Sequence, residues 1–151
     1  MNVQTHDHCG GLAALPAMQR QEIEKAIASC AISPARGAAS KIGAAIEKSL
    51  VDLGWSSEVN LSRGSKITIT SMKHDAGLCL QTGNMSRMYA DLLKLQHMFL
   101  KGTIKVGVMI VPSHVAAKSL GDNITNADRL TRELEIFRNV VHMPLVVFSF
   151  A

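Results

Sequence analysis

The chain has 151 residues, of which 47% are hydrophobic and 19% are charged, and its formal net charge is +4. This length suits one compact domain, and this composition excludes a disordered chain. No apolar run approaches the roughly 18 residues of a membrane span, and the first residues lack the basic and apolar stretches of a secretory signal. The cysteines, Cys9, Cys30 and Cys79, are odd in number and far apart, so no disulfide framework is expected. We therefore expect a soluble, cytoplasmic protein with one core.

The first part of the chain is expected to form two helices. Pro16 stands near the start of the first helix, and the sequence SPARG breaks it before residue 38. From 38 to 53 apolar residues recur at spacings of three and four, which predicts a second helix that ends at Gly54.

The middle of the chain changes to the short patterns of strands. Strands are predicted at 56–62, 66–72 and 77–82, and the turns between them contain glycine and aspartate. Two hairpins in succession are the simplest arrangement of these three strands. A long helix is then expected over 85–100, because apolar residues line one stripe of it.

The last part of the chain predicts a crossover. An almost wholly apolar run at 105–111 is typical of a strand that is covered on both faces. A loop, a helix over 127–139 and a final apolar strand at 144–150 follow. A helix between two strands suggests a right-handed crossover. The predicted class is therefore α/β, with a mixed sheet of about five strands flanked by helices.

Positive charge is concentrated in the middle of the chain. Residues 60–105 contain seven Lys or Arg and only two acidic residues. Lysine and arginine neutralise phosphates, which supplies most of the non-specific affinity of proteins for nucleic acids. This distribution is compatible with a polyanionic partner, and a merely solvated basic face explains it equally well. The sequence contains no glycine-rich phosphate loop and no dinucleotide fingerprint, and its aromatic fraction of 4% is too low for a surface that stacks single-stranded bases.

One stretch resembles a known family of nucleases. The predicted order of helix, three strands, helix and strand is the core order of the restriction-endonuclease-like superfamily, PD-(D/E)XK. The sequence LCLQTGN, residues 78–84, resembles the BglII and BstYI branch of the type II restriction endonucleases, in which an acid-x-Gln strand passes through a glycine turn into a helix. The resemblance covers residues 38–150. It implies an N-terminal extension with one helix over 1–35 and a restriction-endonuclease-like domain over 36–151.

The family resemblance implies Mg²⁺-dependent hydrolysis of duplex DNA. Such hydrolysis uses water activated on a divalent ion that two carboxylates hold. Residues two apart on a strand share a face, so Cys79 and Gln81 are expected on one side, opposite Leu78 and Leu80. Gln81 matches the glutamine of the branch, but Cys79 stands where its metal-binding glutamate would be, and the expected aspartate falls on Thr70. Neither Thr nor a neutral thiol is a good ligand for Mg²⁺.

Three interpretations of this altered site stay open. In the first, Glu47 on the opening helix and Asp75 in a turn bind Mg²⁺ with Gln81 assisting, although both acids also suit a structural role at the surface. In the second, the scaffold has lost hydrolysis and retains DNA binding, or serves as a protein-interaction module. In the third, Cys79 is a nucleophile whose pKa a neighbouring cation lowers.

The expected partners follow from the same resemblance. It implies duplex DNA as the ligand and a homodimer that binds a twofold-symmetric site. The N-terminal sequence HDHC, residues 6–9, has no second half at zinc-like spacing and is expected to be frayed. The residues expected to contact DNA are Arg63, Lys66, Lys73, Asn84 and Arg87.

Overall fold

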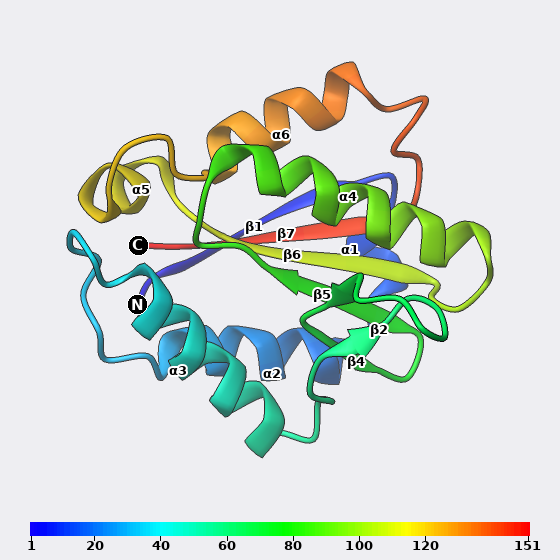
Figure 1. The fold of residues 1–151 in the computed structure, drawn as a ribbon, viewed down its shortest axis with the longest axis horizontal. Helices are drawn as coiled ribbons and strands as arrows, with labels where there is room; N and C mark the ends of the chain where they lie inside the picture. The colour runs from blue at the N-terminus through cyan, green and yellow to red at the C-terminus, as the bar shows by residue number, and fades with distance from the viewer.

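A five-stranded mixed sheet forms the centre of the molecule in the computed structural model, which describes residues 1–151 (Figure 1). The strands lie in the order β1-β7-β6-β5-β4. The three central strands are parallel, whereas β1 and β4 pair antiparallel at the two edges. The predicted α/β class with a mixed sheet is confirmed. The strands of this sheet are Val3–His8 (β1), Ser71–Lys73 (β4), Ala76–Leu80 (β5), Val106–Pro112 (β6) and Leu145–Phe150 (β7).

Helices cover both faces of the sheet and enclose two hydrophobic cores. In Figure 1, α2 and α3 lie on one side of the sheet, and α4 and α6 lie on the other. Successive strand residues alternate between the two cores: Leu78 and Phe148 pack with α2 and α3, while Cys79 and Val147 pack with α4 and α6. All helices are too short or too polar to cross a lipid bilayer. The helices are Gly11–Ala14 (α1), Ala17–Ala28 (α2), Ala39–Asp52 (α3), Met85–Leu100 (α4), His114–Leu120 (α5) and Ala127–Ile136 (α6).

The N-terminal residues belong to the sheet, which corrects the expectation of a separate extension over 1–35 with a frayed start. β1 pairs with β7 along its whole length. His8 is fully buried, and its Nε2 lies 2.6 Å from the carbonyl oxygen of Val141. Ile23 and Ile27 of α2 are also fully buried, in the core that α3 shares. The division at residue 35 therefore does not describe the fold.

The two predicted hairpins are present, but the first is much smaller than expected. Its strands pair only with each other and lie outside the main sheet. The second hairpin joins β4 to β5 and forms one edge of the main sheet. A short helix, α5, occupies part of the region that was expected to be a loop. The small hairpin consists of Val59–Asn60 (β2) and Thr68–Ile69 (β3).

A polar link joins α4 to α6, the two helices that lie on the same side of the sheet. The hydroxyl of Tyr89 donates to the carboxylate of Glu133, and Nε of Arg129 donates to Glu133 Oε1 at 2.6 Å. Burial opposes ionisation of Glu133, but the hydrogen bonds from Tyr89 and Arg129 outweigh it and lower the pKa of this carboxyl.

Replacing Tyr89 with Phe tests this link. The ring stays and the hydroxyl is lost, so we expect the free energy of unfolding to fall by about 0.5–1 kcal/mol at neutral pH. A carboxyl with a lowered pKa stabilises the fold above its ordinary pKa and loses that contribution as pH falls through the lowered value. The difference from the unmodified protein should therefore shrink in acid, as urea unfolding at two pH values would measure. Glu135→Gln is the control, because Glu135 only pairs with Arg138 at the exposed surface.

Candidate functional site

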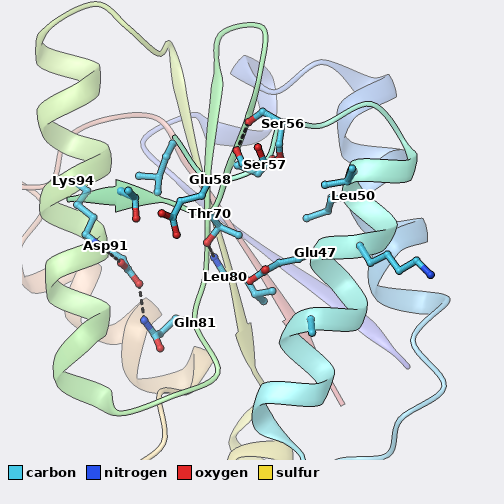
Figure 2. A pocket seen from close by; sticks show the side chains of 16 residues that line it. Glu47, Leu50, Ser56, Ser57, Glu58, Thr70, Leu80, Gln81, Asp91 and Lys94 are labelled. Carbon is cyan, nitrogen blue, oxygen red and sulfur yellow. Dashed lines mark hydrogen bonds and ion pairs between the residues drawn. The ribbon is translucent and has the colours of Figure 1, made fainter. Parts of the chain in front are cut away.

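A cleft lies at the carboxyl end of β5, between α3 and α4 (Figure 2). Its volume is about 450 Å³. Leu80 and Gln81 form part of its floor, and the loop before β2 and the segment around β3 complete its walls. The cleft therefore lies between a helix of each layer, at the end of the strand where the acid-x-Gln motif was expected. The charged residues that line it are Glu47, Lys48, Glu58, Asp91 and Lys94.

A connected polar network occupies the α4 side of the cleft. Gln81 Nε2 donates to Asp91 Oδ2 at 2.7 Å, and Lys94 Nζ donates to Asp91 Oδ1 at 2.8 Å (Figure 2). The amide oxygen of Gln81 accepts from the backbone N–H of Gly83 at 3.0 Å, which fixes the orientation of the amide. Both oxygens of Asp91 are thus engaged. We call these three side chains the Gln81–Asp91–Lys94 network.

The helix positions two members of this network on one face. Asp91 and Lys94 are three residues apart on α4, a spacing that brings side chains together. The helix itself begins at the turn after Gln81, where Asn84 Oδ1 accepts from the backbone N–H of Ser86. Sequence reasoning missed Asp91, which is a buried acid within an apolar stripe. The available signal was a lysine one turn further along the same stripe.

Cys79 lies beneath α4 and does not line the cleft. It is 1% exposed and packs in the core that contains Met85 and Met88 of that helix. Burial, reinforced by the charge of Asp91, raises the pKa of the Cys79 thiol well above its usual value. The sulfur therefore stays protonated at neutral pH, which suits neither a nucleophile nor a metal ligand. Cys79 and Gln81 share a face, but α4 covers the Cys79 part of it.

Thr70 lines the cleft opposite the end of β5. Its Oγ1 accepts from the backbone N–H of Leu80 at 3.0 Å, so the hydroxyl links the residue before β4 to the end of β5. Thr70 therefore completes backbone hydrogen bonding at the position where the family resemblance would require an aspartate.

Two acids face Thr70 from the other walls. Figure 2 shows Glu47 extending from α3 and Glu58 extending from the loop before β2 toward the centre of the cleft. Desolvation of Glu47, together with the charge of Glu58, raises the pKa of Glu47. Glu58 was not a predicted site residue, because it fell within an expected strand. Both acids are exposed, so solvent screens their repulsion.

Asp75 lies away from this cleft. It precedes β5 at the amino end of the strand, whereas Gln81 follows the carboxyl end. Asp75 Oδ2 forms an exposed ion pair with Lys105 Nζ at 3.2 Å. Asp75 lines a separate cavity, so the structure does not bring it together with Glu47.

The five residues expected to contact DNA have different environments, and none of them lines the cleft. Lys73 is mostly buried, and its Nζ donates to Glu22 Oε1 at 2.7 Å and to the carbonyl oxygen of Leu53 at 2.9 Å. Its charge therefore links β4 to α2 and α3. Asn84 caps α4 as described above. Arg63, Lys66 and Arg87 are exposed.

The donors of the cleft do not fit a resident Mg²⁺ ion. No group of three or more His, Cys, Asp and Glu side chains has the arrangement of a metal site. Asp91 uses both oxygens within the network, Cys79 keeps its proton, and the Thr70 hydroxyl is bound to the backbone. Mg²⁺ requires near-octahedral oxygen ligands that usually include free carboxylates. Glu47 and Glu58 are the remaining carboxylates of the cleft, and no third acid joins them to complete such a ligand set.

Comparison with known proteins places these features in a family. Residues 3–150 match the family model described as restriction endonuclease BglII/BglIII. A crystal structure of restriction endonuclease BglII complexed with a DNA 16-mer is similar in fold, with a TM-score of 0.87 and 13% identity over 99% of this chain and 76% of that chain. Free BglII gives a TM-score of 0.80 and 16% identity over 100% of this chain and 80% of that chain. No curated protein matches the chain by sequence.

Proposed function

The chain belongs to the restriction endonuclease BglII/BglIII family, and from this premise we propose that it binds duplex DNA at the cleft between α3 and α4 without Mg²⁺-dependent cleavage. The observation that carries the proposal is the state of Asp91. This acid occupies the α4 side of the cleft, but Lys94 and Gln81 bind both of its oxygens. The fold is retained, while the acid beside Gln81 is already bound and the two free carboxylates of the cleft, Glu47 and Glu58, lie on its other walls.

Binding to duplex DNA is supported by the fold and by the charge distribution. The similar BglII structure is a complex with a DNA 16-mer. In this chain, Arg63 and Lys66 lie at the small hairpin and Arg87 lies in the first turn of α4, and all three are exposed. Exposed cations of this kind contact phosphates and contribute sequence-independent affinity. We also propose a homodimer, which sedimentation of the free protein and of its DNA complex would test.

A binding measurement tests this function. We expect the chain to bind a fluorescently labelled duplex at about 50 mM salt and to lose affinity steeply toward about 200 mM, because phosphate contacts release counterions. Lys66→Gln and Arg87→Gln should each reduce the slope of log affinity against log salt by about one. Lys25→Gln is the control, because Lys25 is exposed on α2, which lies on the opposite side of the sheet from α4. Absence of binding at low salt would point instead to a protein-interaction role.

A second candidate function is hydrolysis at a rebuilt site. The observation that favours it is that Glu47 and Glu58 line the same cleft: burial raises the pKa of Glu47, the charge of Glu58 adds to this effect, and a bound cation would oppose both. Gln81 would assist in such a site, whereas Asp75 lies too far along β5 to take part. Replacing Glu47 and Glu58 with Gln would abolish this activity and would weaken DNA binding in Mg²⁺, because the bound ion would be lost with the two acids.

A further inference from the structure

We propose that Lys94 contacts a DNA phosphate directly within the cleft, so that the chain binds duplex DNA without a divalent cation. The inference rests on the proposed DNA-binding function and assigns one phosphate contact within it. It depends on the geometry of the Gln81–Asp91–Lys94 network, which places a fixed positive charge beside the end of β5.

The ammonium group of Lys94 is held in place by an ion pair and stays accessible from the cleft. Its Nζ donates to Asp91 Oδ1 at 2.8 Å, and the Lys94 side chain is 24% exposed and lines the cleft. An ammonium carries three N–H donors, of which this contact uses one. Because the ion pair already restrains the long side chain, binding a phosphate costs less conformational entropy than it would for a free surface lysine.

The different exposure of Asp91 and Lys94 favours the binding of an anion beside Lys94. The side chain of Asp91 is 9% exposed, compared with 24% for Lys94, so Lys94 is the more accessible member of the pair. Gln81, which follows the end of β5, donates a hydrogen bond to this carboxylate. An incoming phosphate therefore meets the positive member of the pair first. The buried Asp91 charge is compensated by two hydrogen bonds and does not act as a free anion.

The opposite wall of the cleft acts against phosphate binding. Glu47 and Glu58 are exposed acids, and Lys48 is the only other lysine that lines the cleft. Removing one of these acids should therefore strengthen DNA binding in the absence of metal. A site that used the two acids to hold a cation would respond in the opposite direction. Glu58→Gln thus separates the two accounts by the sign of its effect.

The decisive variant exchanges the ion pair for a neutral pair. Asp91→Asn combined with Lys94→Gln leaves the net charge of the protein unchanged and leaves no unpaired buried carboxylate. If the pair only supports the fold, this double variant should bind DNA as the unmodified protein does. If Lys94 contacts a phosphate, the double variant should bind severalfold more weakly and show a salt slope reduced by about one. Lys94→Arg should retain binding, because it keeps the positive charge.

The experiment measures the affinity for a labelled duplex in excess chelator and in Mg²⁺ at matched ionic strength. We expect binding in chelator to be at least as tight as in Mg²⁺, since the free ion competes as a counterion. We also expect tighter binding by Glu58→Gln and the loss described for the double variant, with urea unfolding to confirm that each variant is folded. Binding that requires Mg²⁺, or an unchanged salt slope in the double variant, would overturn the role of Lys94 and leave DNA binding itself intact. No binding under any condition would overturn both.

Discussion

Replacing Cys79 with Glu is expected to lower the free energy of unfolding by about 3 kcal/mol or more, because it buries a charge that has no partner. Cys79 is 1% exposed in the core beneath α4. A carboxylate there would also repel Asp91, whose charge already raises the pKa of the Cys79 thiol. The substitution restores the residue type that the family resemblance would require, yet the surroundings of Cys79 are no longer those of a metal ligand.

Urea unfolding with and without Mg²⁺ measures this effect. Cys79→Ala is the matched control, since it removes the sulfur without adding charge and should cost about 1 kcal/mol. We expect Mg²⁺ to give no recovery in Cys79→Glu. If that variant were as stable as Cys79→Ala and gained further stability in Mg²⁺, the cleft would be an intact metal site that lacks only one acid.

Replacing Gly11 with Ala should have the second largest effect, a loss of about 2–3 kcal/mol from overpacking against backbone. A Cβ added at Gly11 would lie 2.2 Å from the carbonyl oxygen of Leu145. β7 has little freedom to move away, because Leu145 lies between His8 of β1 and Gly107 of β6 in the sheet. Gly11 therefore holds the N-terminal segment against the centre of the fold.

The adjacent glycine provides the control for this prediction. Gly10 has a φ of +80°, and a Cβ there would have no atom within 4 Å. Gly10→Ala should therefore cost only about 1 kcal/mol, through its left-handed backbone. Equal losses in the two variants, measured by thermal unfolding, would mean that the segment after β1 is not packed against β7.

The long elements of the fold were predictable because their apolar patterns are dense. The helix expected over 85–100 is present as Met85–Leu100, and the apolar run at 105–111 became β6, Val106–Pro112. β1 was missed because an edge strand is only partly covered. Its sequence VQTHDH lacks strict apolar alternation, and β7 supplies the pairing that makes it a strand. Such long-range pairing has no local signature.

The candidate site was predictable in its location but not in its composition. The period of a strand correctly placed Cys79 and Gln81 on one face. Whether a residue on that face is open or covered depends on the helix that packs above it, and α4 covers Cys79. Asp91 was hidden because its neighbours form the apolar stripe of that same helix. The separation of Asp75 from Glu47 depends on which end of β5 each approaches, and sequence spacing alone does not determine it.

The same geometry shows which groups occupy the cleft beside the end of β5. Asp91 extends from α4 toward Gln81, and Lys94 neutralises it from the adjacent turn. Asp91 thus supplies the negative charge near the end of β5, and Lys94 of the same helix supplies the positive charge that balances it. A divalent ion would have to displace the Lys94 ammonium to use Asp91, and the remaining acids of the cleft, Glu47 and Glu58, lie on the other walls.

Cleavage of bound DNA in the presence of metal tests the central claim most directly. The protein would be saturated with an end-labelled duplex, incubated with excess Mg²⁺ or Mn²⁺, and the strands separated on a denaturing gel. We predict bound duplex with every strand intact, the same as in chelator. Strand scission that needs the metal, and that Glu47→Gln with Glu58→Gln abolishes, would contradict this account and establish a working hydrolytic site.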